Sequence, residues 1–249
     1  MQISKETIRI LKNFSDINES ITIKAGNEIT TIADIKNVQS RATISETFEK
    51  EFSIYDLRQF LNVINSDTFK DGKFSFGETS VEIVKDNSCV NYVYADPNTV
   101  TSPTKEIDLS EETDIEFTLS KSDLEAISDM KRIFGDSLPD LKVSNSDGRI
   151  ILSVLNKKDK TSNAVSLDVG ESNGHNFEMY FKIEYLKLIK GDYDVQISKE
   201  GISHFKHKEL DLEYWIALEP GGTYDEIDTA SHQKKHVPES KSEEITDTK

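Results

Sequence analysis

The same helical design occurs twice in this chain, and this repeat restricts the folds open to it. The first helix-like segment spans residues 4–17 and the second spans residues 120–134. Each begins with a serine, a residue type that caps helix N-termini. Each then places apolar residues at helical spacing, namely Ile8, Leu11 and Phe14 in the first and Leu124, Ile127, Met130 and Phe134 in the second. The repetition predicts an internal duplication, with two similar halves.

A polar stretch between Asp96 and Asp114 separates the two halves. Pro97 and Pro103 each lie among polar residues there, in patterns typical of turns and extended chain. We therefore predict two domains joined by this linker, at residues 1–105 and 106–219.

The end of the sequence differs in composition from the rest. Residues 220–249 contain seven acidic residues and four lysines, with five apolar residues among them. So few apolar residues cannot offset the entropy lost on ordering a chain. We therefore predict a disordered acidic C-terminal tail over residues 220–249.

Short helices and antiparallel strands are predicted for the remainder. A strand-like segment leads into a second helix in each half, at residues 52–57 and 181–186. Residues 21–23 and 29–31 alternate around a turn and are predicted to pair as a hairpin. Further strand-like segments are residues 81–84, 90–94, 150–155, 192–198, 202–206 and 210–218, of which the last three are predicted to form a closing meander. The fold class is therefore α+β, with two repeated domains that each consist of an antiparallel sheet with two helices on one face.

The net charge restricts the partners of the chain. Its 249 residues include 30 basic and 46 acidic residues, which gives a formal charge of −16. Simple nucleic-acid binders tend to be basic, because they neutralise phosphates and release counterions. We therefore expect no nucleic-acid binding unless the few basic residues gather on one surface.

The sequence lacks the patterns of an active site, a metal site or a membrane segment. His204 and His207 are three apart in a predicted strand, on opposite faces, so a shared metal is not expected. The single cysteine, Cys89, can form no internal disulfide and has no neighbour that would activate it. No stretch approaches about 18 apolar residues, and no apolar signal segment follows Met1. We expect a soluble intracellular protein that is not an enzyme and has no catalytic residue, metal or cofactor.

Basic residues recur on the polar faces of the four predicted helices. On the first helix, Lys5, Arg9 and Lys12 form one stripe opposite the apolar face. The others are Arg58 on the second helix, Lys121, Lys131 and Arg132 on the third, and Lys182, Lys187 and Lys190 on the fourth. For any one helix these residues also fit an ordinary solvated face. Because all four helices belong to one repeated plan, the fold can bring their polar faces to a common surface.

A series of short segments, in order over residues 1–219, matches a known family. These segments are Ser4-Lys5, Leu11-Lys12-Asn13-Phe14, Ile54-Tyr55-Asp56-Leu57, Ala95-Asp96-Pro97, Asp123-Leu124, Asn156-Lys157 and Ala217-Leu218-Glu219. On them the sequence resembles the sliding clamps of T-even-like bacteriophages, the ring-shaped processivity factors of the phage DNA polymerase. The resemblance rests on the order of these segments and on the length of chain that they cover, since none of them is diagnostic by itself.

The resemblance implies a homotrimer in which each subunit supplies two clamp-fold domains to a closed ring. The helices would line the hole around duplex DNA, without sequence preference, and the sheets would form the outer wall. The implied partners are the phage DNA polymerase, which the ring tethers for processive replication, and the clamp-loader ATPase complex, in the cytoplasm of the infected bacterium. Activation of late transcription is a further implied role. A ring held by topology needs only loose phosphate contacts inside, so its outer surface can be acidic.

Matching by position assigns eight basic residues to the DNA-facing surface. They are Lys5, Arg9, Lys12, Arg58, Lys121, Lys131, Arg132 and Lys187. Asp129 departs from the family pattern, which has a basic residue there, and weakens the case for the third helix. The long tail after Glu219 is a second departure. Val100 and Pro103 in the linker are candidates for partner docking, beside ordinary loop packing.

Two alternatives to a clamp stay open from the sequence. One is a non-enzymatic structural or virion protein of two α+β domains without a nucleic-acid role. The other is a hydrolase whose active site is too degenerate to find in the sequence. The oligomeric state and the placement of the basic residues separate these alternatives from a clamp.

Overall fold

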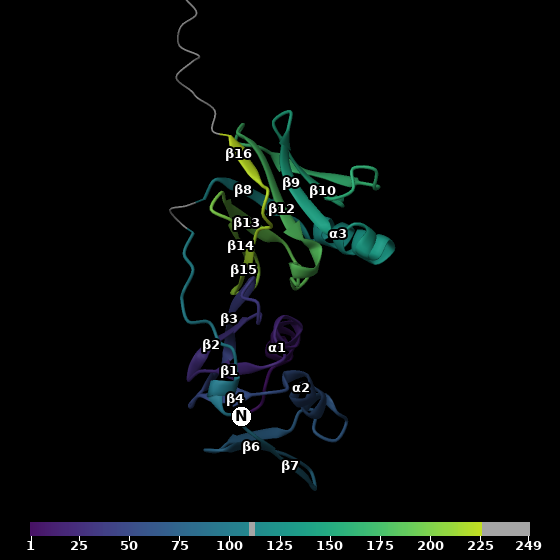
Figure 1. Cartoon of the computed structure of the whole chain (residues 1–249). Helices are drawn as coiled ribbons and strands as arrows, with labels where there is room; N and C mark the ends of the chain where they lie inside the picture. Colours follow the sequence, from purple (N-terminus) through teal and green to yellow (C-terminus); the bar gives the residue numbers. More distant parts are fainter. Residues whose placement is uncertain (110–112, 226–249) are drawn as a thin grey trace, which may run out of the picture.

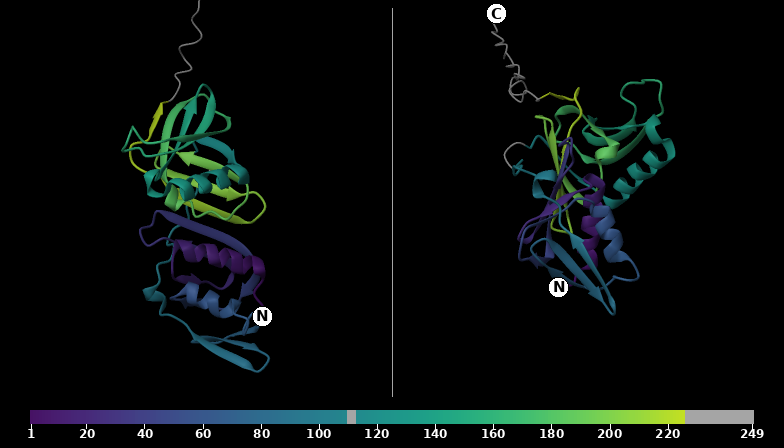
Figure 2. Two further views of the ribbon diagram at one scale, coloured as in Figure 1. Left: turned by 90° about the vertical axis from the view of Figure 1, so that its right-hand side faces the viewer. Right: turned by 60° about the horizontal axis from the view of Figure 1, so that its bottom comes forward.

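The three α-helices of the described chain lie on one side of the molecule (Figure 1). The fold was obtained as a computed structural model that describes residues 1–109 and 113–225. The α-helices are α1 (Lys5–Ile17), α2 (Leu57–Asn65) and α3 (Lys121–Phe134), and short 3-10 turns are η1 (Pro97–Thr99), η2 (Gly135–Ser137) and η3 (Ile183–Tyr185). Seen from the helix side, α3, α1 and α2 follow one another along the length of the molecule (Figure 2, left). The helices predicted at residues 4–17 and 120–134 are confirmed.

A six-stranded antiparallel sheet forms the side opposite the helices and runs through both halves (Figure 1). Its strands, in spatial order, are β2 (Gly26–Ile32), β3 (Val38–Phe48), β15 (Leu212–Ala217), β14 (Ile202–His207), β13 (Tyr193–Ser198) and β8 (Ile115–Leu119). The predicted closing meander is confirmed as β13, β14 and β15. The two halves join where β3 pairs with β15, in a register that places Arg41 opposite Glu213.

Three smaller sheets complete the two halves. In the first half, β5 (Lys73–Phe76), β6 (Ser80–Lys85) and β7 (Ser88–Val93) form a three-stranded sheet, and β1 (Ile21–Ile23) pairs with β4 (Phe52–Ile54). In the second half the order is β11 (Val165–Glu171), β10 (Arg149–Leu155), β9 (Asp140–Ser146), β12 (Asn176–Lys182) and β16 (Thr223–Asp225). β7 and β11 are therefore edge strands, one in each half.

The apolar faces of the helices pack against the sheets as the periodicity predicts. On α1 the side chains of Leu11 and Phe14 are fully buried, and on α3 those of Leu124 and Ile127 are buried. β3 alternates buried and accessible residues along its length, as expected for a strand with one face on the core. Each half thus presents its helices on one side and its long sheet strands on the other.

The fourth predicted helix, which follows residues 181–186, is absent. β12 continues to Lys182, and η3 provides a single turn before the chain becomes irregular. The apolar residues Leu186 and Leu188 are two apart, a spacing that suits extended chain rather than a helix. We call residues 186–192 the strap.

The predicted pairing of residues 21–23 with residues 29–31 is also wrong. β1 pairs with β4 instead, and β2 pairs with β3. The reason is β3, an eleven-residue strand that is not among the predicted strands. It gives β2 a long antiparallel partner and connects it to the rest of the six-stranded sheet.

The chain remains ordered beyond the predicted start of the tail. Thr223–Asp225 forms β16, which pairs with β12, whereas residues 220–249 were predicted to be disordered. The Tyr224 ring stacks on Phe177 and lies beside His175. This one aromatic side chain thus packs residues 223–225 against β12, although the composition of the segment predicts disorder. The rest of the predicted tail, residues 226–249, lies outside the described residues.

Candidate nucleic-acid interface

The basic stripe of α1 lies on the exposed side of the helix. Lys5, Arg9 and Lys12 are all exposed, and none of the three side chains forms an ion pair within residues 1–109 and 113–225. The opposite side of α1 is buried in the core. Packing therefore turns this stripe toward solvent, as the periodicity predicts.

A buried carboxylate fixes the start of α1. The hydroxyl of Ser4 accepts a hydrogen bond from the backbone N–H of Thr7 at 3.1 Å. Glu46, on β3, accepts the backbone N–H of Ser4 and, at 2.5 Å, the hydroxyl proton of Thr7. Burial tends to raise the pKa of Glu46, but these hydrogen bonds outweigh it and lower the pKa below its usual value. A negative charge at this position also interacts favourably with the helix dipole.

Arg58 provides the exposed cation of α2. Its guanidinium lies 3.3 Å from the carboxylate of Asp16, at the end of α1, and 3.9 Å from that of Glu19. All three side chains are more than half exposed, so these ion pairs are weak and salt-sensitive. Arg58 therefore lies beside α1 but shares its charge with two acidic residues.

α3 contributes cations whose charge is offset. Lys121, Lys131 and Arg132 are exposed, but the helix carries as many acidic as basic residues. Arg132 pairs with Asp129 at 3.1 Å, the residue that departs from the expected basic pattern. α1, whose three cations form no ion pair within the described residues, is therefore more basic than α3.

Lys187 lies on the strap instead of a fourth helix. It is exposed, and its ammonium group donates to the backbone carbonyl of Asp16. Lys190, also on the strap, pairs with Glu125 at 3.3 Å. Lys182 belongs to β12 and forms a 2.5 Å ion pair with the buried Asp140, so it is not an exposed cation of this surface. All eight residues that were assigned to the DNA-facing surface are exposed.

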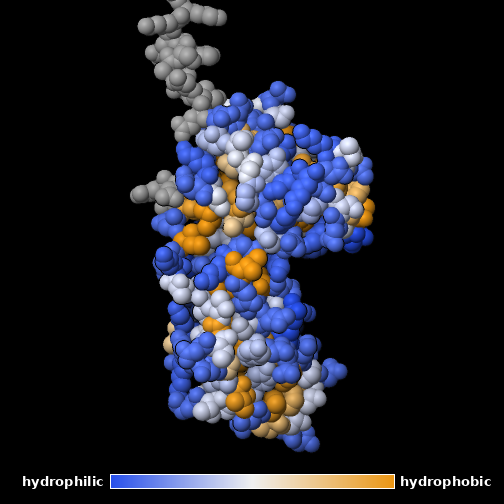
Figure 3. All heavy atoms as spheres, viewed as in Figure 1, coloured by the Kyte–Doolittle hydropathy of each residue, from blue (hydrophilic) through white to orange (hydrophobic). Residues whose placement is uncertain are grey.

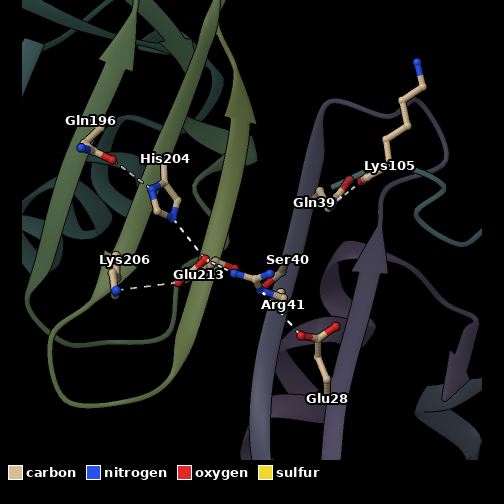
Figure 4. Close-up of polar contacts among 9 residues, drawn as sticks. All are labelled: Glu28, Gln39, Ser40, Arg41, Lys105, Gln196, His204, Lys206 and Glu213. Carbon is tan, nitrogen blue, oxygen red and sulfur yellow. Dashed lines mark hydrogen bonds and ion pairs between the residues drawn. The ribbon is translucent and has the colours of Figure 1, made fainter. Parts of the chain in front are cut away.

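On the opposite side, the cations of the six-stranded sheet are paired. Arg41 lies 2.9 Å and Lys206 lies 4.0 Å from the carboxylate of Glu213 (Figure 4). His204 lies 3.4 Å from the same carboxylate and stacks on Trp215. Burial lowers the pKa of His204 below its usual value, which keeps the ring neutral. Glu213 is thus the ion-pair partner of both Arg41 and Lys206, the two lysine or arginine residues in the strands of this sheet.

The linker runs close to this outer surface. Pro103 lines a hollow of about 220 Å³ together with Arg41 and Trp215, and Gln39 donates to the carbonyl of Lys105 at 3.4 Å (Figure 4). Val100, the other linker candidate for docking, is not among the residues that line this hollow. On the face shown in Figure 3, hydrophilic residues predominate and apolar residues form small separate groups.

Features of other kinds of site are absent from the described part of the chain. No group of three or more His, Cys, Asp or Glu residues there is arranged to hold a metal ion. None of the described helices is long and apolar enough to cross a membrane.

Two family models match the chain, one in each half. Residues 4–71 match the DNA polymerase processivity factor family, and residues 113–220 match the C-terminal domain of the gp45 sliding clamp. Two curated relatives extend over nearly the whole length. The sliding clamp of Vibrio phage KVP40 is 32% identical over 88% of this chain and 99% of the relative, and that of Enterobacteria phage T4 is 28% identical over 90% and 100%.

Solved structures with the same fold include two proteins that are named PCNA, and a DNA polymerase sliding clamp from Pseudomonas aeruginosa matches with a TM-score of 0.60 at 12% identity, over 88% of this chain and 66% of that chain. The PCNA2–PCNA3 complex from Sulfolobus tokodaii matches with a TM-score of 0.64 at 15% identity, over 88% of this chain and 99% of that chain. PCNA from Thermococcus kodakaraensis matches with a TM-score of 0.62 at 14% identity, over 88% and 99%. The fold is therefore that of DNA clamps. The chain belongs to the phage sliding-clamp family, the processivity factors of DNA polymerase. This membership decides against a structural or virion protein.

Proposed function

We propose that three copies of this chain close head-to-tail into a ring around duplex DNA, with the helix side facing the DNA. Each copy would contribute two clamp domains, residues 1–105 and 106–219. The observation that carries this orientation is the contrast between the two sides. The cations of α1 have no ion-pair partner within the described chain, whereas Arg41 and Lys206 on the sheet side share Glu213. Free cations are needed where phosphates approach.

Two edge strands are suited to joining the copies. β7 has one neighbour, β6, and β11 has one neighbour, β10, so each carries unpaired backbone groups. Val93 on β7 is 68% exposed, and apolar surface is visible at that end of the molecule (Figure 3). The other edge of the same sheet is covered, because Phe74 of β5 exchanges backbone hydrogen bonds with Met1. We propose that β7 of one copy pairs with β11 of the next, a heterologous contact that closes when the rotation suits a ring.

The eight assigned cations would then act as a loose phosphate-contacting surface. Phosphate contacts hold a protein on DNA without reading sequence, and they exchange readily as it moves. We therefore propose that Lys5 and Lys12 make the main contacts, together with Arg9, whose guanidinium also donates to the carbonyl of Lys190. Those of Arg58, Lys121, Lys131, Arg132 and Lys187 would be weaker, because neighbouring acidic or carbonyl groups share several of these charges.

The proposed partners follow from membership of the sliding-clamp family. The ring would tether the phage DNA polymerase, be placed on DNA by a clamp-loader ATPase, and act in the cytoplasm of the infected bacterium without catalytic activity of its own. The hollow beside Pro103 and Trp215 is the candidate docking position near the linker. A role in late transcription stays a prediction of the resemblance.

Sedimentation and DNA retention test the proposal. The chain should sediment as a species of three times 28.2 kDa. Once loaded, it should remain on a closed circle and leave a linear duplex through its ends. Removing two charges from α1 (Lys5→Ala with Lys12→Ala) should shorten retention on the circle. The matched pair on the sheet side, Lys206→Ala with Lys208→Ala, should not. A stable monomer, or equal retention on circular and linear DNA, would contradict the ring.

A further inference from the structure

The second half contains a basic element other than its α-helix. α3 carries three basic and three acidic residues, whereas α1 carries three basic and two acidic residues. The strap, residues 186–192, contains Lys187 and Lys190 against a single acidic residue, Asp192. Both lysines are exposed. The strap is thus the more basic of these two elements of the second half.

Side chains of α1 bind the backbone of the strap directly. Asn13 donates its amide N–H to the carbonyl of Lys187 at 2.7 Å. Arg9 donates from its guanidinium to the carbonyl of Lys190 at 3.1 Å. Arg9 and Asn13 are four residues apart, so they lie on the same side of α1 and reach two points of the strap that are three residues apart. The carbonyls of Lys187 and Lys190 thus accept hydrogen bonds from side chains of α1, in place of the backbone N–H groups that would donate to them in a helix.

Two buried tyrosines hold the strap from the sheet side. The hydroxyl of Tyr214 accepts the backbone N–H of Ile189 at 3.3 Å and donates to the amide oxygen of Asn13 at 2.8 Å. The hydroxyl of Tyr193 donates to the carbonyl of Ile189 at 2.5 Å. Both tyrosines are fully buried, and burial raises the pKa of each, so their hydroxyls remain protonated donors. Asn13 thus connects to the strap both directly and through Tyr214.

Packing fixes the far end of the strap. Gly191 is buried against the imidazole of His207, with which a β-carbon at this position would collide. Asp192 accepts the backbone N–H of Lys121, the first residue of α3, at 2.6 Å. The strap is therefore fastened to α1 at Lys187 and Lys190 and to α3 at Asp192. Lys190, which also pairs with Glu125 of α3 at 3.3 Å, lies between the two helices.

From this geometry we infer that the strap is a phosphate-contacting element of the second half, with Lys187 and Lys190 as its contacts. Asn13 and Tyr214 are positioning residues that hold these lysines in the row of helices. The inference rests on the proposed function, because it assumes that the helix side faces DNA. It extends that function to Lys190 and to two uncharged residues that do not themselves need to touch DNA.

The test measures equilibrium binding to a short fluorescent duplex with open ends, which a ring can thread, over a range of KCl concentrations. Lys187→Ala with Lys190→Ala should weaken binding. It should also lower the slope of log affinity against log salt concentration by about 0.9 for each phosphate that the variant no longer neutralises. Tyr214→Phe removes one hydroxyl and should shift binding in the same direction by a smaller factor. Asn13→Ala, at a half-buried position, provides a second positioning variant.

A double-mutant cycle separates positioning from a general effect on stability. In the background of Lys187→Ala with Lys190→Ala, Tyr214→Phe should change DNA binding no further, although it still lowers the melting temperature. An equal effect of Tyr214→Phe in both backgrounds would overturn the positioning role. A normal salt slope for the strap variant, with a reduced slope for Lys5→Ala and Lys12→Ala, would overturn the strap alone. Normal slopes for both variants would instead overturn the proposed helix-side interface.

Discussion

At the scale of single residues, Asp140 shows how a charge is accommodated inside the second half. Its carboxylate is fully buried, pairs with Lys182 at 2.5 Å and accepts the backbone N–H of Lys157 at 2.9 Å. The hydrogen bond to Asp140 also raises the pKa of Lys182. The sequence pattern predicts Lys182 on a helix beside Lys187, but it lies on β12, and the pairing with Asp140 makes it a structural residue.

Removal of Lys182 should therefore destabilise the fold. Lys182→Ala leaves the Asp140 carboxylate buried without its counter-charge, and we expect a loss of about 3 kcal/mol in the free energy of unfolding. Lys208→Ala, which breaks the exposed pair with Asp194, should cost less than about 1 kcal/mol. Urea unfolding at one protein concentration measures both. Equal losses would show that the buried pair has no special role.

His207, which is buried, and His204, which is partly buried, should make stability depend on pH. Burial lowers the pKa of His204 and of His207 below the usual 6.5, so the unfolded chain binds protons more tightly than the folded chain. Their contribution is complete above the unfolded pKa and is lost as the pH falls through the folded values. We expect the free energy of unfolding to decrease as the pH falls below the usual histidine pKa of 6.5.

The variant His207→Asn tests this assignment. The Nδ1 atom of His207 accepts the backbone N–H groups of Glu209 and Leu210, both at 3.1 Å, and an asparagine oxygen can take over this role. The variant should fold and show a shallower pH dependence in urea titrations. An unchanged dependence would assign the effect to other groups.

At the scale of elements, α1 depends on a residue far from it in sequence. The position of Ser4 predicts that it caps the helix. The hydrogen bond that its hydroxyl accepts from the backbone N–H of Thr7 confirms this prediction. The contribution of Glu46 was not predicted, because nothing near residues 4–17 indicates that β3 places a carboxylate at the helix start. The helix that carries the basic stripe is thus anchored by the sheet.

Loss of the Glu46 carboxylate should destabilise α1. In Glu46→Ala the backbone N–H of Ser4 and the hydroxyl of Thr7 lose their acceptor, and we expect a cost of about 1–3 kcal/mol. Folding lowers the pKa of Glu46 below its usual value of 4.5. The carboxylate therefore contributes to the free energy of unfolding above pH 4.5, and this contribution is lost as the pH falls below 4.5 toward the pKa of the folded state. Thermal unfolding at neutral and at acidic pH measures this. The difference between wild type and variant should shrink in acid, and a constant difference would contradict the charge-based explanation.

For the whole molecule, the edge strands β7 and β11 set the expected assembly. Val93 lies on the edge strand β7, whereas Val84 lies on the central strand β6 of the same sheet and is 37% exposed. A lysine at position 93 would place a charge in the proposed β7 to β11 contact. We therefore expect Val93→Lys to convert the assembly to monomers of 28.2 kDa in sedimentation. Val84→Lys should leave it intact. If Val93→Lys retains the larger species, β7 is not the joining edge.

Much of the fold can be predicted from patterns of residues that are close together in the sequence. The helical stripes of α1 and α3, their serine caps and the strands β13 to β15 follow from periods of 3.6 and 2 residues and from capping chemistry. The exposure of Lys5, Arg9 and Lys12 follows as well, because burial of the apolar face turns the opposite face outward. These features depend on neighbours within a few residues of each other.

Three features could be predicted without the structure, because each resides in short segments or in their order: the repeated α+β plan, the basic stripe and the likeness to sliding clamps. The tertiary structure decided which strands pair, as with β1 and β4. It also decided that residues 186–192 form a strap, since their carbonyls bind Asn13 and Arg9 of a distant helix. Only folding brings such partners together, because their contacts join residues more than 170 positions apart.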